Sequence, residues 1–243
     1  MKLNDIALIG ADTVRTRAYL QLLLRNEYII HHCYILTNNP ETIESAAISY
    51  QERKGSPCYF ERDEPVLYTL YKSQVPYTFV LTNNINSALT IDIIRKAEEK
   101  NLIYSGFGGQ IIKKEVFDTG KTFIHVHSGI LPMYRGSTTI YYSLLNEDFC
   151  GASAFVMTPG LDNGDVIAEK RFPMPQKGID IDYIYDPYIR AEVLVEAVEK
   201  YLEKGSFEGR KQQDQDERTY YIAHPVLRHI VRLMQDSERE GSV

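Results

Sequence analysis

Two histidines and an aspartate are the side chains whose types and spacing best suit chemistry. His125 and His127 stand two residues apart in a run that reads as a strand, so both rings face one side of it. Asp162 follows 35 residues after His127. Histidine suits proton transfer near neutral pH, and a nearby carboxylate orients the ring and favours its charged form. Two imidazoles and a carboxylate also make a metal-ligand pattern, so acid–base catalysis and a metal site are both open from these residues alone.

The segments beside these residues are rich in turn-forming types. After His127 comes a loop over 128–136, which reads Ser-Gly-Ile-Leu-Pro-Met-Tyr-Arg-Gly. Asp162 lies in the turn 161–165, which reads Leu-Asp-Asn-Gly-Asp, between strands expected at 151–158 and 165–172. Arg135 in the first loop is either a solvated charge or a contact for a substrate phosphate or carboxylate.

The elements that must position these residues alternate along the chain. Short apolar runs typical of buried strands are separated by segments with helical spacing, which predicts an α/β fold with a mostly parallel sheet and helices on both faces. The expected strands cover 6–10, 31–37, 77–82, 102–105 and 121–127, and the expected helices cover 14–26, 41–53 and 88–100. Ligands of such sheets bind beyond the carboxyl ends of the strands, where the two histidines fall. The first turn, Gly10-Ala11-Asp12-Thr13, lacks the GxGxxG pattern and is interpreted as a tight turn with a helix N-cap, against a substrate-contacting loop.

The pattern changes after Pro175. A long helix is expected over 180–203, ending at a glycine cap. We therefore predict a catalytic core over 1–175, a helical C-terminal extension of the same domain over 176–234, and a disordered tail over 235–243.

Composition excludes several classes of protein. The chain has 243 residues, with 27 Lys and Arg against 33 Asp and Glu, a formal net charge of −6. That balance lacks the basic footprint of a nucleic-acid binder. Three scattered cysteines without a CxxC argue against a disulfide framework and a zinc knuckle. No apolar run approaches the ~20 residues of a membrane span, and the N-terminus does not read as a signal peptide, so we expect a soluble cytoplasmic protein with no membrane partner.

The block 104–173 resembles the folate-dependent formyltransferases, which include methionyl-tRNA formyltransferase, glycinamide ribonucleotide formyltransferase and the sugar-nucleotide N-formyltransferases. Their pattern is Asn-x-His, then Ser-Leu-Leu-Pro-x-(Tyr/Trp)-Arg-Gly, then Leu-Asp-x-Gly-Asp. Residues 125–127, 128–136 and 161–165 follow it in the same order, and 109–113 resemble the family's Gly-Gln-Ile-Leu-Pro. The resemblance implies a Rossmann-like formyltransferase fold with a small C-terminal extension.

The resemblance also implies roles for individual residues. His127 and Asp162 match the catalytic pair, the formyl donor is N10-formyltetrahydrofolate, and the mechanism uses no metal. The expected cofactor-binding residues are Gln110, Ile111 and Ile112, with Pro159 and Gly160 on the opposite wall. The expected substrate-binding residues are Ser128, Tyr134 and Arg135.

One catalytic position departs from the family. The family's Asn, a neutral amide donor for the oxyanion of formyl transfer, is His125 here. A ring nitrogen can also donate, so His125 is interpreted as a third catalytic residue whose charge depends on pH and whose tautomer depends on the partner of its other nitrogen. A different acceptor geometry and an impaired enzyme stay open as alternatives.

The acceptor is predicted from the family's divisions. Net charge −6 and the roughly 70 residues after Pro173 lead us to expect no tRNA partner. We predict an N-formyltransferase acting on the amine of an amino sugar or nucleotide-linked amino sugar, as in nonulosonic (pseudaminic) acid or surface-glycan biosynthesis. The alternatives are formylation of an amino acid or peptide intermediate, a catalytically silent folate or nucleotide-sugar binding module, and a metal hydrolase. The sequence leaves a homodimer open.

Overall fold

The computed structural model describes residues 1–52, 59–147, 149–213 and 217–237. The chain divides into two compact units, and each is described by itself. Unit 1 comprises Met1–His125 and Met157–Pro159, and unit 2 comprises Val126–Val156 and Gly160–Val243.

Unit 1 contains a parallel sheet in the strand order β3-β2-β1-β4-β5. The strands are β1 (Lys2–Gly10), β2 (Ile29–Leu36), β3 (Tyr77–Val80), β4 (Asn101–Ser105) and β5 (Thr122–His127), whose last two residues belong to unit 2. All five expected strands are therefore confirmed, and they form because each is a short apolar or β-branched run.

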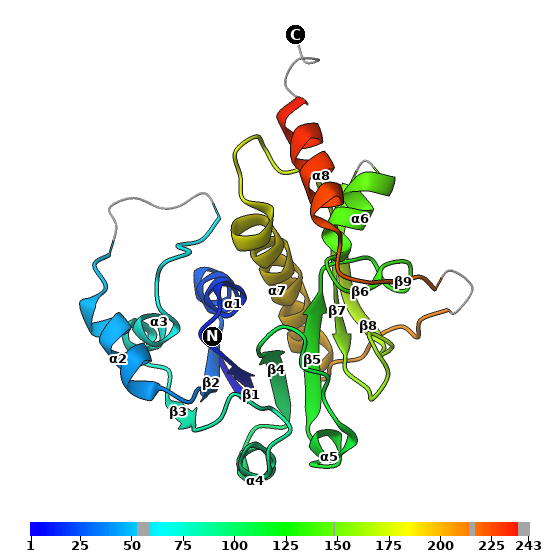
Figure 1. The fold of residues 1–243 in the computed structure, drawn as a ribbon. Coiled ribbons are helices and arrows are strands. Elements are labelled where there is room, and N and C mark those ends of the chain that lie inside the picture. Colours follow the sequence, from blue (N-terminus) through cyan, green and yellow to red (C-terminus); the bar gives the residue numbers. More distant parts are fainter. Residues whose placement is uncertain (53–58, 148, 214–216, 238–243) are drawn as a thin grey trace. The chain divides into compact units, whose positions relative to one another are not determined.

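Helices cover both faces of this sheet. They are α1 (Val14–Arg25), α2 (Pro40–Ser49), α3 (Val66–Ser73), α4 (Ala88–Lys96) and the single turn α5 (Lys114–Phe117). On one face Ala7 and Ile9 join a buried apolar cluster with residues of α4 and α5, and Figure 1 shows α1 on the opposite side of β1. The α/β fold class with helices on both faces is confirmed.

The first strand–helix turn is a tight turn, as expected. A Cβ on Gly10 would lie 2.4 Å from the carbonyl oxygen of Ser105, so only glycine lets β1 approach β4 so closely here. The Thr13 hydroxyl accepts from the Thr16 amide and caps α1. Two differences lie further on: α2 ends at Ser49, with residue 53 of the expected helix outside the described residues, and α3 was not predicted.

Unit 2 is built around an antiparallel pair of strands and a long helix. Strands β7 (Phe149–Val156) and β8 (Val166–Pro173) pair from Phe149 opposite Pro173 to Phe155 opposite Val166. Helix α7 (Asp186–Lys204) packs on both strands through buried aliphatic side chains, which include Ile189, Val193 and Leu194.

Shorter elements complete unit 2. They are β6 (Arg135–Gly136), α6 (Thr139–Asn146), the π-helical turn η1 (Ile181–Tyr185), β9 (Thr219–Tyr220) and α8 (Pro225–Ser237). The helix expected over 180–203 thus starts as a π-helical turn and becomes α-helical at Asp186. Helix α8 extends to Ser237, three residues into the stretch predicted as a disordered tail, and 238–243 lie outside the described residues. Among the helices that the structure describes, none is long and apolar enough to cross a membrane.

Candidate active site

His127 ends β5 and is held in unit 2 by both ring nitrogens. Its side chain is almost completely buried. Nε2 lies 2.6 Å from the backbone oxygen of Tyr134 and 3.2 Å from the Thr139 hydroxyl. A carbonyl oxygen can only accept, so Nε2 carries a proton and donates it. Nδ1 is then the nitrogen that faces Asp162, with 3.6 Å between it and the carboxylate oxygen Oδ2.

Asp162 is fixed in an unusual backbone conformation. Its φ of 47° lies in the left-handed region, which costs a non-glycine residue about 1–2 kcal/mol. The amide of Gly136 donates to Oδ2 at 2.9 Å, so the oxygen that faces His127 is also anchored by a backbone amide. Gly164 lets the turn close, because a Cβ there would lie 1.5 Å from the carbonyl oxygen of Val156. The structure thus places the predicted pair side by side, with the carboxylate oriented toward Nδ1.

This arrangement can hold and move a proton. The 3.6 Å separation exceeds a hydrogen bond but lies within ion-pair range, and both side chains are shielded from water, with 5% and 11% of their surfaces exposed. A charged ring would be satisfied at both nitrogens, by the Tyr134 carbonyl and by the Asp162 carboxylate. Nδ1 is therefore the atom at which a proton is taken up or released.

Thr139 and Gly129 hold His127 in this orientation, and sequence analysis singled out neither. The Thr139 hydroxyl donates to the carbonyl oxygen of Ser128, so it accepts from His127. A Cβ on Gly129 would lie 2.6 Å from the Tyr134 carbonyl oxygen, so glycine lets that carbonyl reach the ring. The loop is held further by Ser153, whose hydroxyl donates to the Gly129 carbonyl at 2.8 Å. The presence of Gly129 two residues after His127 was the only feature of the sequence that could have indicated this close approach.

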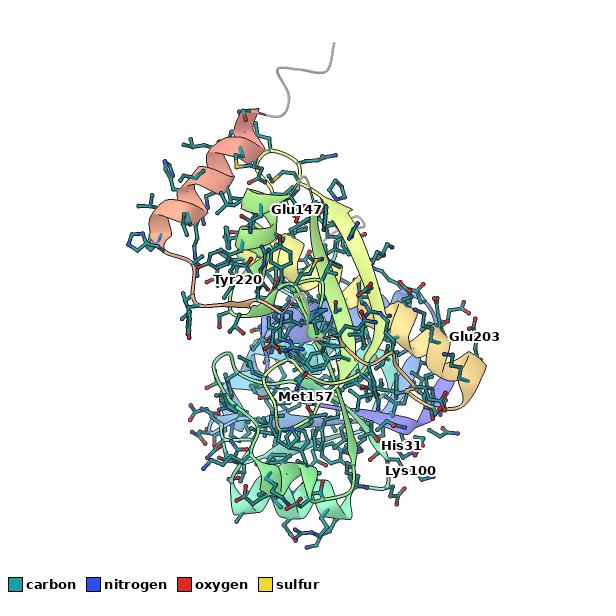
Figure 2. All side chains as sticks on the ribbon, turned by 90° about the vertical axis from the view of Figure 1, so that its right-hand side faces the viewer. His31, Lys100, Glu147, Met157, Glu203 and Tyr220 are labelled. Atoms are coloured by element: carbon teal, nitrogen blue, oxygen red, sulfur yellow. The ribbon has the colours of Figure 1, made fainter. Side chains whose placement is uncertain are left out.

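Ser128 and Tyr134, both predicted to bind substrate, are buried in unit 2. The Ser128 hydroxyl accepts from Arg190 at 2.8 Å. The Tyr134 ring stacks on Tyr220 with 5.4 Å between centroids, and its hydroxyl donates to Glu147 at 3.3 Å. Figure 2 labels these two partners, Tyr220 and Glu147. Burial raises the pKa of Tyr134 and keeps it a neutral donor. Contact of either residue with a substrate stays a prediction.

Arg135, the third residue predicted to bind substrate, is also buried, with 3% of its surface exposed. Its guanidinium forms an ion pair with Glu217 at 2.7 Å and donates to Asn163 at 3.0 Å. It also donates twice to the side-chain oxygen of Gln212, at 2.8 and 3.2 Å. Binding of a substrate anion by Arg135 would require some of these bonds to break.

In unit 1, the Nδ1 nitrogen of His125 is bonded to the neighbouring strand. Nδ1 lies 3.1 Å from the carbonyl oxygen of Tyr104 on the neighbouring strand, so Nδ1 is protonated and donates. In a neutral ring Nε2 is then an acceptor, and it becomes a donor only when the ring is charged. His125 therefore differs from an asparagine amide, which donates at every pH.

The expected pterin-binding segment forms a loop of unit 1 braced by two asparagines. Gln110 donates through its side chain to the backbone oxygen of Asn83. Asn86 donates to the carbonyl of Ile111 at 2.9 Å and accepts from the amide of Lys113 at 2.8 Å. Asn83 and Asn86 were not singled out from the sequence, although both lie in the loop between β3, which ends at Val80, and α4, which begins at Ala88.

The same loop suits a flat, partly apolar ligand. Ile111 exposes 73% of its surface, whereas its neighbour Ile112 is buried in the core. A Cβ on Gly108 or Gly109 would meet no atom within 4 Å, so backbone groups there are open to approach. An exposed aliphatic face beside accessible backbone amides fits the ring of a pterin. Pro159 is exposed in unit 1, and Gly160 is exposed at the start of the second segment of unit 2.

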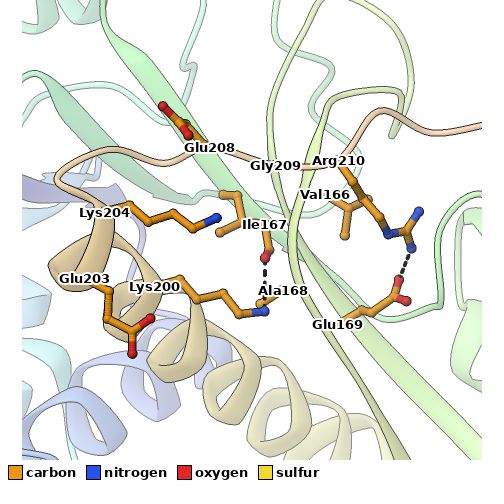
Figure 3. Close-up of a pocket in the computed structure, with 10 residues that line it drawn as sticks. All are labelled: Val166, Ile167, Ala168, Glu169, Lys200, Glu203, Lys204, Glu208, Gly209 and Arg210. Atoms are coloured by element: carbon orange, nitrogen blue, oxygen red, sulfur yellow. Dashed lines mark hydrogen bonds and ion pairs between the residues drawn. The ribbon is translucent and has the colours of Figure 1, made fainter.

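A separate groove lies in unit 2 between the start of β8 and the end of α7 (Figure 3). Its volume is about 630 Å³, and none of the predicted site residues lines it. Three of the charged groups that line it have bonding partners: Lys200 donates to the Ile167 carbonyl at 3.2 Å, and Arg210 pairs with Glu169 at 2.6 Å. Within the described part of the chain, no group of three or more His, Cys, Asp or Glu side chains is placed to hold a metal ion.

Comparison with known sequences gives one family. Residues 46–192 match the sequence profile described as formyl transferase. The methionyl-tRNA formyltransferase of Finegoldia magna is 27% identical over 195 residues, which cover 79% of this chain and 61% of that protein. The methionyl-tRNA formyltransferase of Agathobacter rectalis is 36% identical over 87 residues, 35% of this chain and 28% of that protein. The chain thus spans about 61% of the length of the first of these relatives.

Comparison with solved structures supports the fold. An N-formyltransferase from Helicobacter canadensis, in complex with folinic acid and dTDP-3-aminofucose, superposes with a TM-score of 0.57 at 14% identity and covers 90% of this chain and 71% of that chain. Glycinamide ribonucleotide transformylase 1 from Symbiobacterium toebii gives 0.58 at 12% identity, with 86% and 92% covered. At sequence identities this low, the structural similarity shows a shared fold only.

Proposed function

Because the chain belongs to the formyl transferase family, we propose that it transfers a formyl group from N10-formyltetrahydrofolate to a primary amine. The observation that carries this proposal is the buried pair of His127 Nδ1 and Asp162 Oδ2, 3.6 Å apart in unit 2. Formyl transfer needs a group that relays a proton between an amine and its leaving partner, and a shielded imidazole beside a carboxylate supplies one.

His127 and Asp162 have different roles in the proposed reaction. The carrier supplies a formyl group activated toward amines. His127 holds or moves a proton at Nδ1, and Asp162 stabilises the positive charge that the ring gains. Tyr134 and Thr139 bond Nε2, so the ring cannot rotate during the transfer. Such preorganisation is worth most where water is excluded.

His125 takes the position of the oxyanion donor in this proposal. Since its Nδ1 is committed to the Tyr104 carbonyl, only the charged ring can donate from Nε2. The contribution of His125 should therefore depend on whether its ring is charged, unlike that of an asparagine amide. A His125→Asn variant carries a neutral donor and should lack this dependence.

The formyl carrier is proposed to lie on the loop around Ile111. The exposed Ile111 side chain and the open backbone of Gly108 and Gly109 would contact the pterin, with Gln110 and Ile112 holding the loop in shape. Pro159 and Gly160 are proposed for the opposite wall. Substitution of Ile111 by a charged residue should weaken folate binding without changing the proton relay.

For the acceptor, we propose an amino sugar or a nucleotide-linked amino sugar. A structural neighbour is described in complex with dTDP-3-aminofucose, and another as a sugar N-formyltransferase. Methionyl-tRNA is the second candidate, because the sequence relatives carry that name. The net charge of −6 favours the small acceptor, since tRNA binding needs cationic contacts to phosphates.

A panel assay separates the candidates. Release of tetrahydrofolate is followed with nucleotide-linked amino sugars, free amino sugars, amino acids and methionyl-tRNA, each with wild-type protein and with His127→Ala and Asp162→Ala. We expect turnover with an amino sugar that both variants abolish. Turnover with methionyl-tRNA alone would overturn the proposed acceptor. Folate binding with no turnover on any amine would overturn the proposed activity and favour a catalytically silent binding module.

A further inference from the structure

Gln212 lies far along the chain from the catalytic motifs, yet its side chain contacts the turn that carries Asp162. We infer that Gln212 is a positioning residue for Asp162, an inference that rests on the function proposed above. The residue belongs to the polar stretch between α7 and α8 and to no motif singled out in the sequence.

The Gln212 carboxamide uses its full bonding capacity on this network. Its two N–H groups donate to the carbonyl oxygens of Asp162 and Gly164, each at 2.8 Å. Its oxygen accepts two bonds from the Arg135 guanidinium, at 2.8 and 3.2 Å. Two donors and two acceptor sites are all that an amide side chain has. A residue placed at random on a surface does not meet four partners of the correct polarity.

The two carbonyls that Gln212 bonds follow directly after the place where the backbone is strained. Asp162 has a φ of 47°, a conformation that must be held by its surroundings. Gly136 holds the carboxylate of the same residue, and Gln212 holds its carbonyl. Arg135 precedes Gly136 in the chain and donates to both Gln212 and Asn163, so it links the Gly136 contact with the Gln212 contact. Hydrogen bonds from Gly136 and Gln212 therefore hold the carboxylate that faces His127 at 3.6 Å.

The segment before Gln212 has its register fixed against β8. Arg210 and Val166 exchange two backbone hydrogen bonds, each of 2.9 Å. Gly209 permits this approach, since a Cβ there would lie 2.7 Å from the Val166 carbonyl oxygen. Arg210 also pairs with Glu169, as Figure 3 shows. Gln212 follows two residues later, so its position is set by backbone contacts and not by its own side chain alone.

The segment after Gln212 is fixed on the other side of the site. The amide of Arg135 donates to the Arg218 carbonyl at 2.9 Å, and β6 pairs with β9 through Arg135 and Thr219 and through Gly136 and Tyr220. Gln212, which holds the Asp162 carbonyl, thus comes from a part of the chain beyond the predicted catalytic core of 1–175.

The test is Gln212→Glu, with Gln213→Glu as the matched control. Glutamate has the same shape and can still accept from Arg135, but it cannot donate to the carbonyls of Asp162 and Gly164. Gln213 is exposed, and its substitution makes the same charge change one residue away. We expect Gln212→Glu to lower kcat between about 10- and 100-fold with little change in KM for the formyl donor, because a misplaced catalytic group costs that much. Gln213→Glu should stay within twofold of wild type.

A second readout does not depend on turnover. The NMR resonances of the His127 ring, assigned by their loss in His127→Gln, should change position and titration in Gln212→Glu and stay as in wild type in Gln213→Glu. Gln212→Ala, which adds no charge, should shift the same resonances and serves if Gln212→Glu does not fold. Unchanged His127 resonances in a folded Gln212 variant would overturn the inference. Absence of turnover in the wild type, with the resonance shifts intact, would instead overturn the proposed function and leave the positioning role supported.

Discussion

Asp162→Asn tests the electrostatic part of the proposed site most directly. Asparagine tolerates the left-handed region in which Asp162 lies, and its side-chain oxygen can still accept from the Gly136 amide. The substitution therefore removes a negative charge 3.6 Å from His127 Nδ1 and leaves the turn in place. The thermal midpoint should remain within a few degrees of wild type.

The size of the effect follows from the distance and the burial. Two unit charges 3.6 Å apart interact by about 4–5 kcal/mol at the effective dielectric of ~20 that suits protein sites. Both side chains are nearly buried, so solvent screening removes little of this energy. If the charged ring forms only in the transition state, the loss corresponds to a decrease in kcat of about 10³-fold.

The assay is initial-rate tetrahydrofolate release with the acceptor found in the panel, at several pH values. Asp92→Asn, which neutralises an exposed carboxylate in an i,i+4 pair on α4, serves as the control and should keep wild-type kcat. A folded Asp162→Asn protein with kcat within threefold of wild type would refute the reasoning, because the carboxylate would then contribute no charge stabilisation at His127.

Three further outcomes are expected. Gly129→Ala should lower kcat at least tenfold in the same rate assay, because its Cβ would displace the Tyr134 carbonyl that orients His127. Gly164→Ala should destabilise the fold by more than about 3 kcal/mol in urea titrations, since its Cβ would lie 1.5 Å from a carbonyl oxygen. For Glu99, burial alone would raise the pKa, but the hydrogen bonds from His31 and Tyr34 bring it below its ordinary value. The ionised form therefore stabilises the fold above the ordinary carboxyl pKa of about 4.3, and this stabilisation is lost as pH falls through the lowered value. In urea titrations, the free energy of unfolding of Glu99→Gln should be roughly 1–3 kcal/mol lower than that of wild type at neutral pH, and this difference should shrink in acid. A difference that does not depend on pH would contradict the assignment.

The sheet of unit 1 could be predicted because its strands are marked by composition. Each is a short run of apolar or β-branched residues, and the segments between them have helical spacing. Helix α3 was missed because it covers only eight residues and follows directly after Pro65 in a stretch with several prolines. Its stability comes from packing on α1 and α2, which no local pattern reports.

The motifs single out His127 and Asp162 as a pair, but they do not predict the geometry of that pair. The Asn163-Gly164 sequence signals a turn, yet nothing local shows that Asp162 itself adopts the left-handed conformation. The protonated nitrogens of His125 and His127 depend on which carbonyl each ring meets, and Tyr104 and Tyr134 are identified only by the fold. The tautomers in turn decide which nitrogen is available for chemistry.

Arg135 shows why a charged residue in a motif is hard to interpret from sequence. An arginine in a sequence can be a solvated charge, a substrate contact or a buried structural residue. Which of these Arg135 is depends on its partners Gln212 and Glu217, which lie 77 and 82 residues further along the chain. A buried guanidinium is costly unless each of its donors is met, so the partners and the arginine depend on one another. Because Gln212 bonds both Arg135 and the Asp162 turn, the contacts that keep Arg135 buried also help to hold the Asp162 turn in place. The C-terminal segment is therefore expected to affect turnover as strongly as residues that lie within the motifs.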